Sequence, residues 1–271
     1  MKLGRIRTED GLRFALDAGS GWQLMDPSIP DTATAISRMG GTHLGPVERE
    51  SPPFKCPIVS PTKVIAIGLN YLDHIRETGV ARPSQPVVFA KFPNSLSGPR
   101  DHVVVPIELT READYEIELA VVIGRACRSV AASQALTHVF GYTIANDVSP
   151  RDLQRTDPQL SWAKSVDGFC PIGPWITTAD EVGDPQALGI KSWVNGEMRQ
   201  SSTSAEMLFS VGELIEHLSR TMTLLPGDVI LTGTPHGVGF SMTPPRFLVS
   251  GDVVRGEIER LGYIENPISS S

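Results

Sequence analysis

The chain has 271 residues, of which 40% are hydrophobic and 20% charged, and its formal net charge is −7. This length suits one large domain, or a large domain with a small one, and we favour the second arrangement. The acidic balance argues against a nucleic-acid-binding surface, which normally carries a basic stripe, and no apolar stretch approaches the length that spans a membrane.

Residues 1–55 differ from the rest in their sequence pattern, which predicts a small, β-containing N-terminal domain. They combine short alternating stretches with loops rich in Asp, Gly and Pro, and a Ser-Pro-Pro linker stands at 51–53. Residues 56–271 would then form the main domain. Strands dominate there, among them apolar runs at 64–68, 86–90 and 119–123.

Helices are few. The clearest one follows Ser210, because apolar residues then recur at helical spacing to about Thr221. A shorter helix is expected from Ala132 towards Val139. The dipeptide Asn195-Gly196 predicts a hairpin, since it suits the two positive-φ positions of a type I′ turn. The expected fold is therefore a mixed, β-rich α+β fold with mostly antiparallel strands.

The first candidate site lies in residues 70–77, directly after the expected strand at 64–68. On a helix His74 and Glu77 share one face, so the carboxylate can orient the imidazole as a general base. The alternative is an exposed helix with solvated charges, in which His74 has no role.

The second candidate is the run from Asp114 to Gly124. If it is one strand, Asp114, Glu116 and Glu118 share a face, because side chains alternate across a strand. Buried carboxylates must be paired, protonated or bound to a cation, and a divalent metal would meet that need. The alternative is a solvated strand end with Arg111 and Arg125 as counter-charges.

Asp147 stands at the end of another apolar strand and could be a further metal ligand. It could equally lie just before the start of a helix without binding a metal, since Ser149-Pro150 is a helix-start signature. Arg151 and Gln154 then lie three residues apart, on one helical face, where they could bind a polar substrate.

Two later segments add polar groups. Lys164 is surrounded by apolar residues, so it either meets an anionic partner or extends to the surface. Residues 231–239 form a glycine-rich loop after a strand, with hydroxyl and backbone donors suited to a carboxylate. This loop lacks the pattern of a dinucleotide-binding or P-loop motif.

Absent motifs narrow the possibilities further. The sequence has no G-x-S-x-G, H-E-x-x-H or C-x-x-C, which argues against a serine hydrolase or a zinc protease. Three widely spaced cysteines fit reduced thiols better than disulfides, and the N-terminus lacks the apolar core of a secretory signal. A cytoplasmic protein is expected.

Taken in order, these segments resemble the fumarylacetoacetate hydrolase family over about residues 57–262. The shared motifs are Asn-Tyr-x-x-His-x-x-Glu at 70–77, Glu-x-Glu at 116–118, Arg-Asp-x-Gln at 151–154, Ala-Lys-Ser at 163–165 and Gly-Thr-Pro-x-Gly at 233–237. The resemblance implies a catalytic domain built as a β-sandwich roll, usually in a homodimer. It also implies a bound Mg²⁺ or Mn²⁺ whose ligands are Glu116, Glu118 and Asp147, which leaves Asp114 at the periphery.

The resemblance further implies a metal-dependent hydrolase that cleaves a carbon–carbon bond in a short 2,4-dioxo acid, an acylpyruvate or a fumarylpyruvate-like compound. The products would be pyruvate and a carboxylic acid. His74, oriented by Glu77, would activate water, with Lys164 as a further catalytic residue. The expected substrate-binding residues are Arg151, Gln154, Thr234 and Tyr71.

Other outcomes of the same chemistry stay open. Decarboxylation of an oxaloacetate-type acid, or isomerisation of an oxo-diacid, needs the metal but no attack by water. A more remote alternative is a non-catalytic, metal-binding dimer. In each case the expected partner is a small 2-oxo acid, with no nucleic acid and no membrane.

Overall fold

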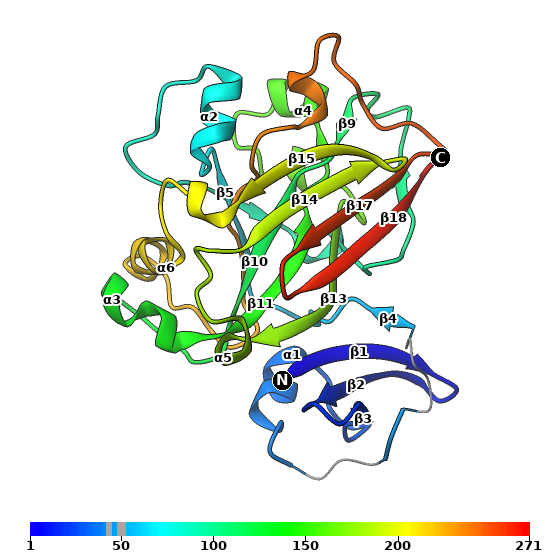
Figure 1. The fold of residues 1–271 in the computed structure, drawn as a ribbon, viewed down its shortest axis with the longest axis vertical. Helices are drawn as coiled ribbons and strands as arrows, with labels where there is room; N and C mark the ends of the chain where they lie inside the picture. The colour runs from blue at the N-terminus through cyan, green and yellow to red at the C-terminus, as the bar shows by residue number, and fades with distance from the viewer. Residues whose placement is uncertain (42–44, 48–52) are drawn as a thin grey trace.

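The computed structural model describes residues 1–41, 45–47 and 53–271. Two β-sheets dominate it, with short helices at their ends and edges (Figure 1). Most strand pairs are antiparallel, and the exceptions among the described residues are β16 with β5, β13 with β7 and β18 with β8. The expected mixed, β-rich α+β fold is thus confirmed.

The larger sheet has the order β3-β2-β1-β13-β11-β10-β16-β5-β6, with β4 beside β1 and β7 beside β13. Its strands are β1 (Lys2–Thr8), β2 (Gly11–Asp17), β3 (Trp22–Leu24), β4 (Phe54–Lys55), β5 (Val64–Gly68), β6 (Val87–Lys91), β7 (Leu96–Ser97), β10 (Ile117–Ile123), β11 (Val139–Asn146), β13 (Cys170–Thr178) and β16 (Val229–Leu231).

The second sheet has the order β15-β14-β17-β18-β8, and a two-stranded pair, β12-β9, stands apart. These strands are β8 (Val103–Val105), β9 (Ala113–Asp114), β12 (Ser149–Pro150), β14 (Gly189–Val194), β15 (Glu197–Thr203), β17 (Val253–Ile258) and β18 (Gly262–Ser270). The α-helices are α1 (Thr32–Ser37), α2 (Leu72–Thr78), α3 (Ala132–Ala135), α4 (Arg151–Thr156), α5 (Ala179–Val182) and α6 (Val211–Ser219).

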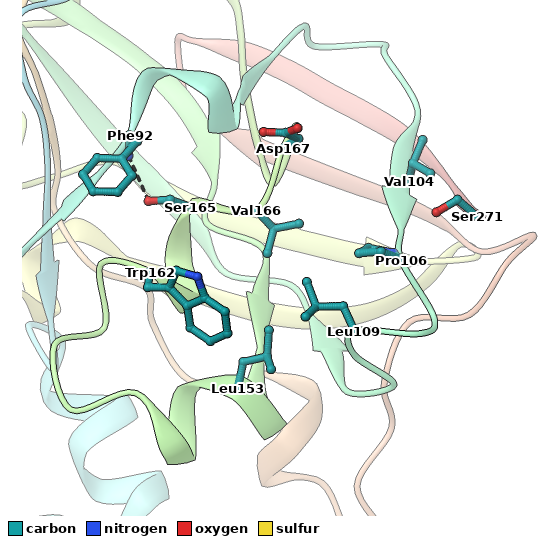
Figure 2. Close-up of a pocket in the computed structure, with 10 residues that line it drawn as sticks. All are labelled: Phe92, Val104, Pro106, Leu109, Leu153, Trp162, Ser165, Val166, Asp167 and Ser271. Atoms are coloured by element: carbon teal, nitrogen blue, oxygen red, sulfur yellow. Dashed lines mark hydrogen bonds between the residues drawn. The ribbon is translucent and has the colours of Figure 1, made fainter.

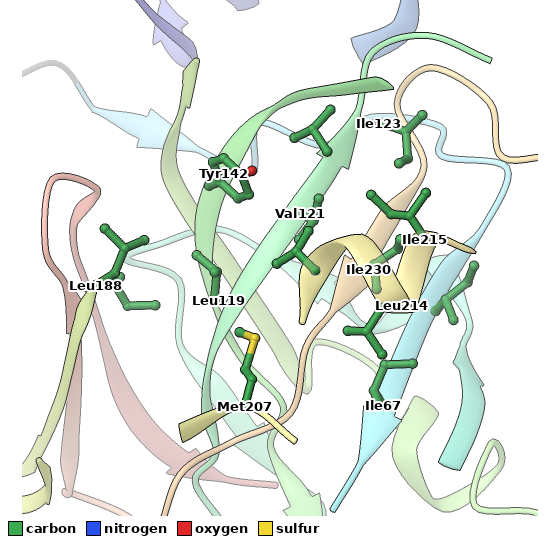
Figure 3. Close-up of a cluster of buried hydrophobic side chains, with 14 of the residues drawn as sticks. Ile67, Leu119, Val121, Ile123, Tyr142, Leu188, Met207, Leu214, Ile215 and Ile230 are labelled. Atoms are coloured by element: carbon green, nitrogen blue, oxygen red, sulfur yellow. The ribbon is translucent and has the colours of Figure 1, made fainter. Parts of the chain in front are cut away.

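The main core lies where α6 covers β10, β11, β16 and β5 (Figure 3). Leu214 and Ile215 of α6 belong to the same buried cluster as Val121 and Ile230 of the sheet. Burying each such side chain contributes roughly 1.5–3 kcal/mol. This cluster keeps the middle of the large sheet rigid, and β10 carries part of the site described below.

Local sequence signals located several elements correctly. Ser210 caps α6, and its side chain and that of Glu213 form a reciprocal capping box. A 3₁₀-helix at Leu136–His138 extends α3, as the expected short helix requires. The hairpin between β14 and β15 turns at Asn195 and Gly196, which both have positive φ.

The N-terminal part shares the large sheet with the rest of the chain. Its ribbon lies at one end of the molecule, yet β1 pairs antiparallel with β13 (Figure 1). Leu3 and Phe14 also belong to one buried cluster with Val64 and Ile172. A boundary near residue 55 stays a prediction, and residues 51–52 of the expected linker lie outside the described residues.

Candidate metal centre and active site

Three buried carboxylates meet where β10 begins and β11 ends. Glu116, Glu118 and Asp147 each offer an oxygen atom, and these atoms lie within 4.8 Å of one another. Antiparallel pairing of β10 with β11 makes this meeting possible, because the Asp147 N–H donates to the Glu116 carbonyl at 2.9 Å. The solvated strand end that we weighed for residues 114–124 is excluded, since Asp114, Glu116 and Glu118 are all buried.

The expected single strand from Asp114 to Gly124 is wrong in one respect. Asp114 ends β9, which pairs with β12, whereas β10 begins only at Ile117. The run is therefore divided between two strands, with Tyr115 and Glu116 between them, and Asp114 is not one of the three clustered carboxylates.

The three carboxylates differ in charge environment. Burial raises the pKa of Glu118 well above its usual range, and the neighbouring charges of Asp147 and Glu116 raise it further. Burial also raises the pKa of Glu116, but Arg151 and Lys164 outweigh it and hold this pKa well below the usual range. Glu118 accepts a hydrogen bond from the Gly233 N–H at 2.8 Å.

Two buried lysines compensate part of the negative charge. Lys164 is 2% exposed and its Nζ lies 2.7 Å from Glu116 Oε2 and 2.9 Å from Asp147 Oδ2. Lys91 is 1% exposed, and its Nζ donates to Asp147 Oδ1 at 2.7 Å and to the Lys164 carbonyl. Lys164 thus meets anionic partners and does not extend to the surface. Asp147 caps no helix, because α4 begins at Arg151 without a side-chain cap.

Arg151 links the carboxylate cluster to the segment that carries Phe240, a short 3₁₀-helix at Gly239–Ser241. Its Nη1 lies 2.6 Å from Glu116 Oε1 and 3.0 Å from Gln154 Oε1. Its Nε and Nη2 donate to Asp114 Oδ2 at 2.9 and 2.8 Å. Asp114 also accepts the backbone N–H groups of Gly239 and Phe240, and the Phe240 ring lies over the guanidinium at 4.4 Å.

The helix α2 brings in the expected pair of His74 and Glu77. His74 Nδ1 lies 2.9 Å from Glu77 Oε2, and Glu77 Oε1 accepts the Gly237 N–H at 2.9 Å. Gly237 has φ +99° and a Cβ there would lie 2.1 Å from the Arg199 carbonyl oxygen, so only glycine fits. His74 is 6% exposed and lines the cavity described next.

A cavity of about 300 Å³ brings most of these groups to one space. Its walls include His74, Glu116, Glu118, Arg151, Gln154, Lys164, Thr234 and Phe240. Thr234 Oγ1 donates to the Ile117 carbonyl at 3.0 Å and accepts from Gln200 at 2.8 Å, which fixes its position in the wall. α2 and α4 lie at the same end of the molecule, away from the N-terminal strands (Figure 1).

Tyr71 is the exception among the expected substrate contacts. Its side chain is fully buried in the main hydrophobic core, and it is not among the residues that line the cavity. Tyr71 precedes α2 and bridges to Met207, so its place at the helix entry directs the ring into the core.

The cluster fits a divalent cation. Four carboxylates and three cationic side chains are packed together there: Asp114, Glu116, Glu118, Asp147, Lys91, Arg151 and Lys164. If all four carboxylates are ionised, one negative charge is left over in a buried environment, where an uncompensated charge is costly, in agreement with the raised pKa of Glu118. Three carboxylate ligands without Cys or His are the donor set of hard cations. Glu116, Glu118 and Asp147 would hold such an ion.

A second, largely apolar groove is lined in part by residues of the same segments (Figure 2). Leu153 and Trp162 contribute to it, and they flank Gln154 and Lys164 in the sequence. Trp162 and Phe92 are 60% and 53% exposed. The groove contains none of the carboxylates of the cluster and is separate from the cavity.

Comparison with known proteins places this geometry in a family. Residues 63–269 match the family described as fumarylacetoacetate (FAA) hydrolase C-terminal. The chain belongs to this family. A mitochondrial oxaloacetate tautomerase of Bos taurus is 42% identical over 276 residues, which cover 95% of this chain and 88% of the relative.

Solved structures of the fumarylacetoacetate hydrolase family agree. The fumarylacetoacetate hydrolase of Exiguobacterium antarcticum superposes with a TM-score of 0.88 at 38% identity, covering 100% of both chains. The 2-hydroxyhepta-2,4-diene-1,7-dioate isomerase of Mycobacterium marinum gives 0.79 at 36% identity, covering 100% of this chain and 99% of the other. The expected family fold is confirmed.

Sequence reasoning missed two residues of this family member's site. Lys91 ends the run Val-Val-Phe-Ala-Lys, and alternation places it on the same face as buried Phe89. This position on the buried face of the strand could have been used as a signal, because a lysine there needs an anionic partner. Phe240 begins a segment, residues 240–247, that we expected to shape specificity, but its contact with Arg151 was not predicted, because the short 3₁₀-helix Gly239–Ser241 that carries it is held by Asp114.

No helix in the described part of the chain is long and apolar enough to cross a membrane. The tautomerase relative of Bos taurus is named as mitochondrial. A cytoplasmic location for this chain stays a prediction.

Proposed function

We propose that the chain catalyses proton-transfer isomerisation of short 2-oxo acids, with keto–enol tautomerisation as the main reaction. Support comes from the relatives, which include an oxaloacetate tautomerase and a dioate isomerase. Hydrolysis of a carbon–carbon bond, the reaction expected first from the sequence, is not confirmed by these relatives. They favour the alternative that needs no attack by water.

The observation that carries the proposal is the pair of His74 and Glu77 beside the carboxylate cluster. Glu77 is held by Gly237 and in turn fixes the Nδ1 side of His74, so that Nε2 is the free proton acceptor. His74 removes a proton from C3 of the bound 2-oxo acid and returns a proton to the 2-oxo oxygen, which gives the enol. No atom is gained or lost.

Negative charge grows on the 2-oxo oxygen when the proton leaves C3. A bound divalent cation, which we propose to be Mg²⁺ or Mn²⁺, supplies Lewis-acid stabilisation for that charge. Lys164 adds positive charge beside it, since its Nζ already lies among the carboxylates. Arg151 and Gln154 bind the substrate carboxylate, and Thr234 forms part of the cavity wall that the substrate contacts.

The test is to supply oxaloacetate with Mg²⁺, with Mn²⁺ and with a chelator, while following three products. Enol conversion is read from ultraviolet absorbance, decarboxylation from released CO₂, and hydrolysis from pyruvate formed out of acetylpyruvate. We expect metal-dependent enol conversion to be the fastest. Rapid CO₂ release, or rapid cleavage of acetylpyruvate, would instead select the decarboxylase or the hydrolase.

A variant separates catalysis from metal binding. His74→Asn should reduce enol conversion by about 10²-fold or more, as loss of a general base does, while Mn²⁺ binding stays intact. Glu116→Ala should abolish both. Intact Mn²⁺ binding without turnover of any of these acids in the wild type would support the non-catalytic alternative.

We also propose a homodimer, as the family resemblance implies. The exposed apolar groove lined by Phe92 and Trp162 supports this, because large exposed apolar patches mark interaction sites. Light scattering on the purified chain should give twice the chain mass, and Trp162→Glu should give the monomer. A monomeric wild type would refute the proposal.

A further inference from the structure

The general base and the carboxylate cluster belong to different parts of the fold. His74 stands on α2, whereas Glu116, Glu118 and Asp147 lie where β10 begins and β11 ends in the large sheet. The helix α2 is only seven residues long, and its N-cap residue, Tyr71, makes no side-chain cap hydrogen bond. Contacts outside the helix therefore set the distance from the imidazole to the cluster.

The strand β15, at the edge of the second sheet, is tied to the cluster through Gln200, which is fully buried. The side-chain oxygen of Gln200 accepts the N–H of Ile117, the residue between Glu116 and Glu118, at 3.2 Å. Its NH₂ group donates to Thr234 Oγ1 at 2.8 Å and to the next carbonyl in the chain at 2.9 Å. One side-chain amide thus fixes β15 against the start of β10 and against the glycine-rich loop.

The same strand is tied to α2 through Ser202. Alternation along a strand places Ser202 on the same face as Gln200, two residues earlier. Ser202 Oγ donates a hydrogen bond to Asp73 Oδ2, and Asp73 Oδ1 accepts the backbone N–H of His74 at 2.7 Å. This contact lies near the C-terminal end of β15, next to α2 (Figure 1). A single side chain, that of Asp73, therefore joins Ser202 to the residue that acts as the base.

Two neighbouring charged groups contribute less to this attachment. His236 Nε2 lies 4.0 Å from Asp73 Oδ2, beyond the range of a hydrogen bond. Arg76 of α2 pairs with Glu206, just after β15, but the Arg76 side chain is 67% exposed and such a pair contributes only about 0–1 kcal/mol. The Asp73 side chain is 12% exposed. The hydrogen bond from Ser202 to Asp73 is therefore the better shielded of the two links.

We propose that Ser202 is a positioning residue for proton transfer. Through Asp73 it holds α2 against β15, and it thereby sets where His74 stands relative to the carboxylate cluster. Gln200 fixes the same strand to the start of β10, so both ends of this connection are defined. Ser202 does not line the cavity and acts only through Asp73. The inference rests on the proposed function, because it concerns the base of the same reaction.

Ser202→Ala removes the hydroxyl donor and tests the proposal in the Mg²⁺-loaded protein with oxaloacetate. We expect kcat for enol conversion to fall about tenfold, since a misplacement of ~1 Å can cost about 10²-fold in rate. KM, and the dissociation constant for Mn²⁺ measured by calorimetry, should stay within about twofold, because Arg151, Gln154 and the three carboxylates do not lie on α2. A general loosening of the fold would change all three quantities.

Three further variants isolate the hydrogen bond. Ser202→Thr keeps a hydroxyl on a side chain that suits a strand, and it should restore about half of the wild-type kcat or more. Arg76→Gln is the matched control, because it breaks the exposed link between α2 and the end of β15, and it should leave kcat unchanged. Asp73→Ala should lower kcat at least as much as Ser202→Ala. Adding Ser202→Ala to it should cause no further loss, since both act on one hydrogen bond.

Each outcome decides one of the two proposals. Equal kcat values for Ser202→Ala and Arg76→Gln overturn the inference, as do additive losses from Ser202→Ala and Asp73→Ala or a failure of Ser202→Thr to restore kcat. The proposed function fails separately. If the wild type cleaves acetylpyruvate and does not convert the enol, a loss of cleavage in Ser202→Ala that Ser202→Thr reverses supports the positioning role but overturns the proposed function.

Discussion

Removal of the Asp114 carboxylate should uncouple Arg151 from the loop that carries Phe240. Asp114 is fully buried and accepts two hydrogen bonds from Arg151 and one each from the Gly239 and Phe240 N–H groups. Asp114→Ala leaves all these donors without their acceptor. Arg151 keeps only Glu116 and Gln154.

The expected loss of stability is large. Breaking a buried ion pair on one side costs about 3–5 kcal/mol, and an unsatisfied buried donor about 1–3 kcal/mol. Since Arg151 retains two acceptors, we expect roughly 3–5 kcal/mol in total for Asp114→Ala. Asp114→Asn keeps one acceptor and the shape, so about half of that is expected.

The assay is urea denaturation together with KM and kcat for a 2-oxo acid. KM should rise more than kcat falls, because Arg151 binds substrate and does not transfer the proton. Glu112→Gln is the matched control: Glu112 pairs with Arg155, joining the same two segments, but that pair is partly exposed. Such a pair contributes only about 0–1 kcal/mol. If Asp114→Asn and Glu112→Gln changed stability and KM alike, the reasoning would be refuted.

Three further predictions concern stability. Lys91→Met removes one of the two cations that pair with buried Asp147, and it should lower the free energy of unfolding in urea by about 3 kcal/mol. The control is Lys55→Met, which removes a surface pair with Asp101 and should lower it by about 1 kcal/mol or less. Equal losses of stability in the two variants would contradict this prediction. Burial raises the pKa of Glu77, but the hydrogen bonds from His74 and Gly237 outweigh it and lower this pKa below its ordinary value of 4.5. The wild type should therefore be more stable to unfolding than Glu77→Gln at pH values above 4.5, and this difference should disappear as the pH falls through the lowered pKa. A stability difference that grew in acid would contradict the lowered pKa. Ser210→Ala breaks the capping box of α6 and should cost about 1 kcal/mol, and an unchanged denaturation midpoint would exclude that role.

Local chemistry explains why parts of the fold could be predicted from the sequence. Ser210 and Glu213 are three residues apart, and Asn195-Gly196 is a two-residue turn, so neither depends on distant residues. The strand at Val64–Gly68 was also visible, because four of its five residues are buried and apolar. Such elements are set by neighbours in the sequence.

Long-range pairing explains what could not be predicted. Nothing in residues 2–8 indicates that β1 joins the large sheet beside β13, more than 160 residues later. The break between Asp114 and Ile117 depends in the same way on the pairing of β9 with β12. Asp114 was therefore assigned to the correct neighbourhood but to the wrong strand, and its contact with Arg151 was not predicted.

The charge balance of the cluster connects the metal to the kind of acid that fits. With its four carboxylates ionised and three cationic side chains, the cluster holds one negative charge in excess. A divalent cation would turn this into one positive charge, which matches a single carboxylate. The same count that makes the cluster suitable for a divalent metal therefore also makes the metal-loaded cluster suitable for an anionic group such as the carboxylate of a 2-oxo acid.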